Sequence, residues 1–462
     1  MKLSVRDITR AVGGQLILGD PMAEVEGISI DSRQIARGSM FVALKGERVD
    51  GHAYVVSAWR QGAAALLVSR LDWLQGESKV SCAVIRVNDT LEAMKYFGMF
   101  MRGRFTGPVV GITGSNGKTT TKQMVTGVLK THDRGLSTSG NYNSQIGLPI
   151  VLSLLSSDDK WMVLEMGASA PGNIANLCEM AKPTIGILTS IGPAHLATFG
   201  SLKRIAETKW ELMDALPENG TAIVPWGEPL LDPHVRAYKK RIVFIGEDPS
   251  CPVRASQIEV GERVRFRLHI GSDSEMVNLP LPGRCNVVNA LAAAAAGWVL
   301  KYSMIDIVRG LESFEPPRMR MEVTRLASGA VIVNDAYNAN PASMAHAVHS
   351  LIESYPERKR ILVLGSMLEL GDDSDRYHFH LGTEVGRCPV EKVFLLGKEM
   401  RQALDGALSV GAPAGRFVFS DGHDDVAREL RGMMAPDSVV LFKGSRGMKL
   451  EKIIEAVAPT AS

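Results

Sequence analysis

The chain is predicted to be an α/β protein with three domains, and two observations lead to this fold class. Its 462 residues correspond to about three domains at roughly 150 residues each. Short, β-branched apolar runs alternate with helical stretches almost throughout, as expected of strands buried between helices. We therefore expect a mostly parallel sheet in the central domain and a Rossmann-like α/β domain at the C-terminus.

Ten apolar runs are predicted as buried strands because each is short and bounded by turn or helix signals. They cover residues 64–68, 109–113, 161–165, 184–189, 221–224, 242–245, 331–334, 361–364, 393–396 and 439–442. Helical stretches are expected over 90–102, 122–130 and 205–212, and an alanine-rich stretch over 290–300 is expected to be a buried helix.

Two boundaries divide the chain. The first lies near Gly103, where a helical stretch ends just before a predicted strand. The second lies at Glu315-Pro-Pro317, because consecutive prolines cannot continue a helix. The expected units are residues 1–103, 104–315 and 316–462.

Composition and charge exclude several classes of protein. Hydrophobic residues make up 45% and charged residues 22%, which excludes a disordered or collagen-like chain. The net charge of +2 provides no overall field for a polyanion, so neither nucleic-acid binding nor a membrane-surface role is expected.

The cysteines and apolar runs indicate a cytoplasmic location. The five cysteines are widely spaced and form no CxxC pair, which favours reduced thiols over disulfides or a zinc site. Charged residues precede any apolar run at the N-terminus, and the run 290–300 is shorter than the roughly 20 residues that cross a bilayer. Membrane insertion is therefore not expected.

The strongest motif is a glycine-rich loop between a predicted strand and a predicted helix, Gly111-Ile-Thr-Gly-Ser-Asn-Gly-Lys-Thr-Thr120. Its glycines let backbone N–H groups approach phosphate oxygens, Lys118 can neutralise the β- and γ-phosphates, and the Thr119 hydroxyl can ligate Mg²⁺. Ile112 stands where a strict Walker A motif has glycine, so this is a shortened variant. The context favours a P-loop over a glycine-rich turn with a chance lysine. The expected phosphate contacts are Gly114, Ser115, Asn116, Gly117, Lys118, Thr119 and Thr120.

Two more predicted strands end in polar side chains at the same sheet edge. Glu165 ends one strand and could hold Mg²⁺, the alternative being a capping or loop carboxylate. His195 follows the next strand; a lone histidine is more often structural than a ligand, but its position beside the P-loop strengthens the case. Lys209 lies between acidic residues on a predicted helix and by itself is expected to be a solvated lysine paired with glutamate.

Six motifs occur in order along the chain. They are Thr113-Gly-Ser-Asn-Gly-Lys-Thr-Thr120, Gly140-Asn-Tyr-Asn-Ser-Gln-Ile-Gly-Leu-Pro149, Leu164-Glu-Met-Gly-Ala168, Ile191-Gly-Pro-Ala-His-Leu196, Asn334-Asp-Ala-Tyr-Asn-Ala-Asn-Pro341 and Lys443-Gly-Ser-Arg-Gly-Met448. Together they resemble the Mur ligases of peptidoglycan synthesis. The fifth and sixth motifs, with Met367-Leu-Glu-Leu-Gly371, resemble the member that joins D-alanyl-D-alanine to UDP-N-acetylmuramoyl-tripeptide. The Asp-Asn-Pro-Arg motif of the sister enzyme that adds the third residue is absent.

This resemblance implies an ATP-dependent amide ligase. ATP would convert the tripeptide carboxylate into an acyl phosphate, and the amine of D-alanyl-D-alanine would attack it through a tetrahedral intermediate. Lys118 and Thr119 would hold phosphates and, with Glu165, a first Mg²⁺, while His195 would ligate a second. Lys209 matches the lysine that CO₂ carbamylates, which gives the residue the negative charge suited to a place beside two Mg²⁺ ions.

The resemblance also assigns residues outside the P-loop region. Arg320 matches an arginine that reaches ATP phosphates, Asp335 and Asn338 match ribose and adenine contacts, and Asn289 matches an adenine-side asparagine. Without the family, Asp335, Asn338 and Asn289 would be interpreted as turn, cap or loop residues, because Asn and Asp favour turns.

By the same resemblance, two further sets of residues are expected to contact the UDP-linked donor and the acceptor dipeptide. Ser32 and Arg33 match a pocket for the uridine diphosphate group, so the first unit is expected to bind the UDP-linked substrate. Lys443, Ser445 and Arg446 are expected near the acceptor dipeptide or the acyl carboxylate.

Two positions depart from the family pattern. Cys285 stands where the family usually has histidine, and Ser366 replaces a usual acid. The contacts made by the family's histidine and acid are therefore not expected in this chain. The rival functions are another ligase of this superfamily, including folylpolyglutamate synthetase, and a regulatory or transport ATPase. A monomer is the default expectation, and both diaminopimelate and lysine remain candidates for the donor's third residue.

Overall fold

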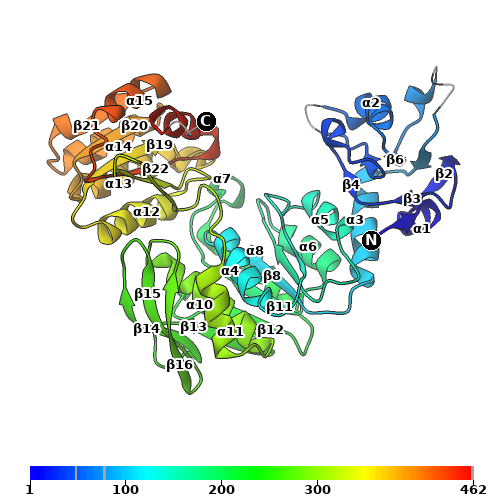
Figure 1. The fold of residues 1–462 in the computed structure, drawn as a ribbon, viewed down its shortest axis with the longest axis horizontal. Coiled ribbons are helices and arrows are strands. Elements are labelled where there is room, and N and C mark those ends of the chain that lie inside the picture. Colours follow the sequence, from blue (N-terminus) through cyan, green and yellow to red (C-terminus); the bar gives the residue numbers. More distant parts are fainter. Residues whose placement is uncertain (47–48, 76, 78–79, 459–462) are drawn as a thin grey trace.

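The computed structural model describes residues 1–46, 49–75, 77 and 80–458, and it forms three lobes, each built around its own sheet. Figure 1 shows the blue N-terminal lobe and the yellow-to-red C-terminal lobe on opposite sides of the cyan-to-green central lobe. The last four residues of the expected third unit, 459–462, lie outside the described residues. Among the described residues, no helix is both long enough and apolar enough to cross a membrane.

The N-terminal lobe contains a five-stranded sheet that is parallel except at its β2 edge. In spatial order its strands are β2 (Gln15–Leu18), β7 (Ala83–Arg86), β6 (Ala65–Val68), β5 (Met40–Val42) and β4 (Ile28–Ser29). A small antiparallel pair and three helices complete the lobe: β1 (Leu3–Ser4), β3 (Glu24–Val25), α1 (Val5–Ala11), α2 (Val55–Arg60) and α3 (Thr90–Gly103). Asp89 caps α3 by accepting the backbone N–H groups of Leu91 and Glu92.

The central lobe contains a nine-stranded sheet, parallel from β9 to β14 and antiparallel at its far end. In spatial order its strands are β16 (Asp273–Leu279), β15 (Val264–Ile270), β14 (Val253–Glu259), β13 (Arg241–Gly246), β12 (Thr221–Pro225), β11 (Ile185–Leu188), β8 (Val109–Thr113), β10 (Met162–Glu165) and β9 (Leu136–Ser137). Its helices are α4 (Lys118–Leu129), α5 (Gly147–Ser153), α6 (Asn173–Ala181), α7 (Leu196–Phe199), α8 (Leu202–Asp214), α9 (Asp232–Ala237), α10 (Cys285–Val299) and α11 (Met304–Ser313).

The C-terminal lobe contains a six-stranded sheet with apolar cores on both faces, the Rossmann-like form that the sequence predicts. In spatial order its strands are β17 (Glu322–Arg325), β18 (Val331–Asn334), β22 (Ser438–Lys443), β19 (Lys359–Gly365), β20 (Lys392–Leu396) and β21 (Phe417–Ser420), and only β17 is antiparallel. Its helices are α12 (Pro341–Ser354), α13 (Ser374–Arg387), α14 (Met400–Ser409), α15 (His423–Arg431) and α16 (Glu451–Val457).

All ten predicted strands are present, and their ends differ by at most two residues from the prediction. The antiparallel strands β14, β15 and β16 were not predicted. Their buried residues alternate with polar ones, so they lack the continuous apolar runs on which the prediction relied. Helix α4 begins at Lys118, four residues before the expected start, because the helix follows the loop glycine Gly117 directly.

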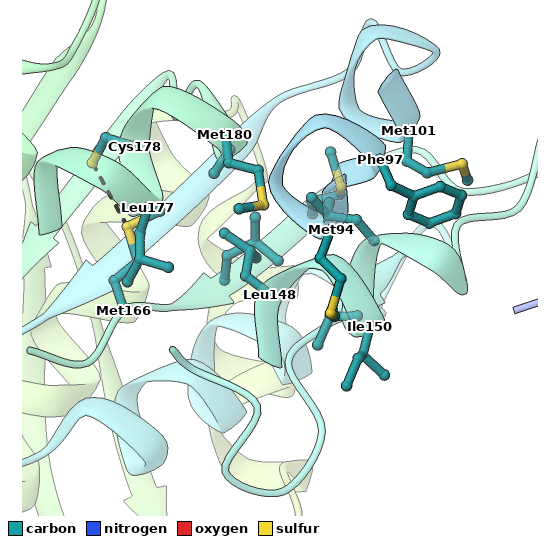
Figure 2. Close-up of a cluster of buried hydrophobic side chains, with 14 of the residues drawn as sticks. Met94, Phe97, Met101, Leu148, Ile150, Met166, Leu177, Cys178 and Met180 are labelled. Atoms are coloured by element: carbon teal, nitrogen blue, oxygen red, sulfur yellow. Dashed lines mark hydrogen bonds between the residues drawn. The ribbon is translucent and has the colours of Figure 1, made fainter. Parts of the chain in front are cut away.

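The N-terminal and central lobes share an apolar core at α3. Met94, Phe97 and Met101 of α3 are buried in the same cluster as Leu148 of α5 and Met180 of α6. Figure 2 shows these side chains meeting between the two lobes. The alanine-rich helix α10 is also buried, as predicted, and packs closely against α4.

Candidate active site

A cavity of about 1000 Å³ lies between the central and C-terminal lobes and gathers most of the candidate residues. The central lobe contributes the P-loop, the loops after β10 and β11, one face of α8 and the start of α10. Of the predicted residues it is lined by Gly114, Ser115, Asn116, Gly117, Lys118, Thr119, Thr120, Glu165, His195, Lys209, Asn289, Arg320, Asp335, Asn338 and Lys443.

The P-loop adopts a conformation that requires glycine at two positions. Gly114 has φ +150° and Gly117 has φ +82°, and a Cβ atom on Gly114 would collide with the Thr189 hydroxyl. The Lys118 ammonium group folds back over the loop and donates to the carbonyl oxygens of Gly114 at 2.7 Å and Ser115 at 3.2 Å. Removal from solvent lowers the pKa of Lys118, and the nearby Arg320 lowers it further against the opposing effect of Glu165.

The loop after β11 is fastened to the P-loop by a reciprocal pair of hydrogen bonds. The Ser115 hydroxyl donates to the Gly192 carbonyl at 2.8 Å and accepts the Gly192 N–H at 2.9 Å. The Ser115 N–H donates to the Ser190 carbonyl at 2.8 Å. Movement of the P-loop must therefore move the segment that leads to His195.

Glu165 presents one unsatisfied oxygen at the end of β10. Its Oε1 accepts from Asn143 Nδ2 at 2.9 Å, whereas its Oε2 is buried without a hydrogen-bond partner among the described residues. A buried carboxylate oxygen without a partner is costly unless a ligand satisfies it. Asn143, which the sequence analysis did not assign, fixes the orientation of this carboxylate; its place in the Gly140–Pro149 motif was the available signal.

A buried lysine supports Glu165 from behind. Lys122 Nζ donates to the Thr138 carbonyl at 2.5 Å, and the Thr138 hydroxyl accepts the Glu165 N–H at 3.0 Å. Burial lowers the pKa of Lys122, with the Glu165 charge acting in the opposite direction. No local pattern distinguishes Lys122 from an ordinary helix lysine.

His195 stands at the start of α7 with a left-handed backbone, φ 52°. Its Nδ1 lies 2.7 Å from Glu369 Oε2 of the C-terminal lobe. This contact leaves Nε2 for another partner. Among the described residues, no group of three or more His, Cys, Asp or Glu side chains is placed to hold a metal ion alone, so a cation here would also need phosphate or water ligands.

Lys209 is buried, and the expectation of a solvated lysine paired with glutamate was wrong. Its residue is 3% exposed and lies on the same face of α8 as Ile205 and Leu212, which are also buried. That spacing of four and three residues was a signal for burial. Glu211, its acidic neighbour, instead accepts the N–H groups of Gly172 and Ala175 at the start of α6.

The environment of Lys209 disfavours the charged amine. Burial, with a contribution from the Lys118 charge, holds the pKa of Lys209 well below its usual value. The side chain thus brings an amine of reduced basicity into the cavity.

Asn289 joins α10 to the P-loop helix. Its Oδ1 accepts from the Thr121 hydroxyl at 3.1 Å, and its Nδ2 donates to Asn286 Oδ1 at 3.0 Å. A Cβ atom on Gly117 would collide with Asn289 Oδ1, so the amide packs directly against the loop.

The C-terminal lobe presents Arg320 on a strained segment. Met319 and Met321 on either side of it have φ 58° and 52°, and its guanidinium carbon lies 4.2 Å from the centre of the Tyr337 ring. Such stacking restricts the guanidinium plane. Tyr337 lines the cavity as well, although the sequence analysis assigned it no role.

Lys443 supports the segment that carries Asp335 and Asn338. Its buried Nζ lies 2.7 Å from Asp335 Oδ2 and donates to the Asn338 carbonyl at 3.0 Å. Asp335 Oδ1 also accepts the Met321 N–H at 3.2 Å. Lys443 is therefore engaged with its own lobe at the cavity wall.

Four predicted residues do not line the cavity. The Ser445 hydroxyl accepts the Leu368 N–H at 2.9 Å, and Arg446 pairs with Glu451 at 3.0 Å, so both are engaged within the C-terminal lobe. Ser32 is buried in the N-terminal lobe. Exposed Arg33 forms two side-chain hydrogen bonds with Asp31, at 2.9 and 2.8 Å.

Comparison with known proteins covers the whole chain. Three family models match: the Mur ligase family, catalytic domain, over residues 24–102; the Mur ligase middle domain over 112–297; and the Mur ligase, glutamate ligase domain over 319–446. UDP-N-acetylmuramoyl-tripeptide–D-alanyl-D-alanine ligase of Bacillus subtilis is 35% identical over 98% of both chains.

Solved structures give the same result. The crystal structure of MurF from Acinetobacter baumannii superposes with a TM-score of 0.89, at 30% identity and 99% coverage of both chains. MurF ligase from Thermotoga maritima in complex with ADP gives a TM-score of 0.81, at 28% identity and coverage of 94% of this chain and 97% of that one. Because sequence and structure agree over all three lobes, the chain belongs to the Mur ligase family.

Proposed function

We propose that this chain uses ATP to join D-alanyl-D-alanine to UDP-N-acetylmuramoyl-tripeptide, giving the pentapeptide precursor of peptidoglycan. The observation that carries the proposal is the single cavity in which the P-loop, Glu165 and Lys209 face Arg320 of the C-terminal lobe. Relatives that align over nearly the whole chain and are named as ligases for D-alanyl-D-alanine support the choice of acceptor. Folylpolyglutamate synthetase and a transport ATPase are less well supported because the relatives match the N-terminal lobe too.

The P-loop is proposed to bind the phosphates of ATP. Its backbone N–H groups and the N-terminus of α4 favour anions, and Lys118 is free to exchange its two carbonyl acceptors for phosphate oxygens. Arg320 would approach the same phosphates from the opposite lobe. Asn289, Asp335 and Asn338 line the cavity where the nucleoside would lie.

Mg²⁺ fits the side chains present. The unsatisfied Glu165 oxygen, the Thr119 hydroxyl and His195 would hold two ions together with phosphate oxygens and water. Bound there, Mg²⁺ would offset the negative charge that two anionic reactants bring together. Lys209 is proposed to carry a carbamate from CO₂; only the neutral amine reacts, and the low pKa of Lys209 raises the fraction of neutral amine.

The chain's own residues then position the reactants and exclude water. Phosphorylation gives the donor carboxylate a leaving group, and the amine of the dipeptide displaces phosphate from the acyl carbon. Lys118 and Arg320 hold the transferred phosphoryl group, while closure of the two lobes protects the acyl phosphate from hydrolysis.

The three lobes are proposed to divide the substrates. Residues 1–103, with Ser32 and Arg33, would bind the UDP group; 104–315 would bind ATP and metal ions; and 316–462 would complete the nucleotide site and bind the acceptor. Of the three acceptor candidates, Lys443 lines the present cavity. Ser445 and Arg446 lie outside it, so their proposed contact with the acceptor requires the C-terminal lobe to present them differently when substrates bind. ATP and a UDP-linked donor are cytoplasmic metabolites, so the enzyme is proposed to act in the cytoplasm. A monomer is its default proposed oligomeric state.

The direct test is phosphate release from ATP and Mg²⁺ with UDP-N-acetylmuramoyl-tripeptide and one acceptor at a time. We expect turnover with D-alanyl-D-alanine and none with a single amino acid.

Lys209→Ala should reduce the rate by about a hundredfold or more, as loss of a central electrostatic group does. Lys203→Ala, at a position 82% exposed on the same helix, is the matched control and should keep the rate. Turnover only with a single amino acid would refute the proposed acceptor, and near-full activity of Lys209→Ala would refute the carbamate.

A further inference from the structure

A reciprocal pair of amide side chains connects the P-loop to the C-terminal lobe. Asn340 Nδ2 donates to Asn116 Oδ1 at 2.8 Å, and Asn116 Nδ2 donates to Asn340 Oδ1 at 3.4 Å. Asn340 is 8% exposed, although its partner lies 224 residues away in the chain and in another lobe. Both residues line the cavity.

On the central lobe, the backbone of Asn116 is held in place. Its N–H donates to the Ser190 hydroxyl at 3.0 Å, and its carbonyl accepts from the hydroxyls of Thr189 at 2.5 Å and Ser190 at 3.2 Å. The left-handed glycines Gly114 and Gly117 stand on either side. The direction of the Asn116 side chain therefore depends on the conformation of the P-loop.

On the C-terminal lobe, Asn340 begins α12. Its Oδ1 accepts the Ser343 N–H at 2.9 Å, and its own N–H donates to the Ser343 hydroxyl at 3.0 Å. This capping box already uses the side-chain oxygen. The Oδ1 atom therefore serves both the cap and the weaker hydrogen bond from Asn116, whereas the Nδ2 group serves the contact between lobes alone.

Other polar contacts between these lobes are more exposed. The side chains of His195 and Glu369 are 39% and 65% exposed, and those of Arg325 and Glu262 are 53% and 37% exposed. Exposed pairs are weak and screened by salt, whereas a buried amide donor left without a partner is costly. In Figure 1, α12 lies on the side of the C-terminal lobe that faces the central lobe.

We propose that Asn340 is a positioning residue that couples seating of the C-terminal lobe to nucleotide binding at the P-loop. This inference rests on the proposed function, because it requires nucleotide phosphates to bind the loop. The amide pair is satisfied only when the loop presents Asn116 and α12 is seated against it. By thermodynamic reciprocity, nucleotide that orders the loop favours seating, and seating raises nucleotide affinity by the same factor.

The test uses the full chain and ADP as the probe. Asn340→Ser keeps a good N-cap but is too short to reach Asn116; Asn340→Ala loses both the cap and the contact. We expect both variants to bind ADP about three- to tenfold more weakly in calorimetric titrations. They should also show less compaction than the wild type in small-angle scattering when ADP is added.

A double-mutant cycle with Asn116→Ala separates coupling from independent damage. We expect the double variant Asn116→Ala, Asn340→Ala to lose no more ADP affinity than the single variant that binds ADP more weakly. Ser4→Ala, which removes the N-cap of α1 in the N-terminal lobe, controls for loss of a cap and should leave ADP affinity unchanged.

Three results would overturn the inference. They are additive losses in the cycle, wild-type ADP binding by Asn340→Ser with a loss only in Asn340→Ala, and equal compaction in all variants. Failure of the wild-type chain to bind ADP would instead count against the proposed function.

Discussion

His378 is a buried side chain whose neutral form the C-terminal lobe requires. It is fully buried on α13; its Nε2 accepts the Met367 N–H at 3.0 Å, and its Nδ1 lies 2.8 Å from the Ser374 carbonyl. Burial lowers the pKa of His378 below the ordinary 6.5. Protonation would turn His378 Nε2 into a donor that faces the Met367 N–H. Because the unfolded chain binds this proton more readily, acid favours the unfolded chain.

The contribution of neutral His378 to the free energy of unfolding should therefore be complete above about pH 6.5. It should decrease as the pH drops toward the lowered pKa of His378. One proton contributes a slope of at most about 1.4 kcal/mol per pH unit. His378→Gln can still accept the Met367 N–H without titrating, so its urea-unfolding stability should depend less on pH. His380→Gln, at an exposed position on the same helix, should behave like the wild type. Parallel pH profiles for all three proteins would contradict this role.

At the residue scale, sequence position predicted the loop and strand-end residues better than it predicted side-chain environment. Glu165 and His195 were found because parallel strands end at one edge. The burial of Lys209 required the helix face as well as its neighbours, and the partners Asn143 and Tyr337 required the fold. Long-range contacts such as Asn116 with Asn340 leave no local pattern from which to predict them.

At the scale of elements, the P-loop helix depends on a close glycine crossing. Helix α11 packs against α4 at Gly310, where a Cβ atom would lie 2.6 Å from the Val128 backbone nitrogen, and a Cβ atom on Gly127 would lie 2.7 Å from the Gly310 carbonyl oxygen. Backbone contact of this kind cannot give way as a flexible side chain can. The position of α4, and therefore of Lys118 at its start, is set by this crossing.

Gly310→Ala should consequently lower the free energy of unfolding by about 1–3 kcal/mol, as overpacking does, and should weaken ADP binding. Gly103→Ala is the control, because it also adds a methyl group near a helix end but meets nothing within 4 Å. Urea unfolding and ADP titration measure the two effects. Equal stability of the two variants would show that α11 can move without cost.

Most of the predicted strands lie where both faces of a sheet are covered, although β5 and β7 of the N-terminal lobe are equally buried and were not predicted. Continuous buried apolar runs form β8, β10, β11 and β12 of the central sheet and β18, β19, β20 and β22 of the C-terminal sheet, because helices cover both faces of a parallel sheet. Strands β14, β15 and β16 carry polar residues on one face, so they contain no unbroken apolar run that would have predicted them. The alternation itself was present in the sequence.

At the scale of the whole molecule, the apolar cores are divided unevenly among the lobes. One cluster extends from Leu3 in the N-terminal lobe through α3 to Leu231 in the central lobe. The two cores of the C-terminal lobe contain none of these residues. Apart from Tyr377 against the small cluster around Phe199, the C-terminal lobe meets the central lobe mainly through polar groups.

This division predicts how the molecule unfolds. The N-terminal and central lobes should unfold together because separating them exposes the shared core at α3, and the C-terminal lobe should unfold in a transition of its own. ADP should raise the temperature of the joint transition, since the P-loop of the central lobe is its proposed binding site. Differential scanning calorimetry with and without ADP would resolve the two transitions.

Phe97→Ala tests which lobes cooperate, because Phe97 is 2% exposed within the shared cluster (Figure 2). Loss of this ring should cost about 3–5 kcal/mol and lower the joint transition, while the C-terminal transition should stay in place. Tyr96→Ala, at the adjacent, 44% exposed position on α3, is the matched control and should leave both transitions unchanged. A variant in which only the N-terminal lobe melts early would show that the core at α3 joins two independently folding lobes, since a cooperative pair must lose stability together.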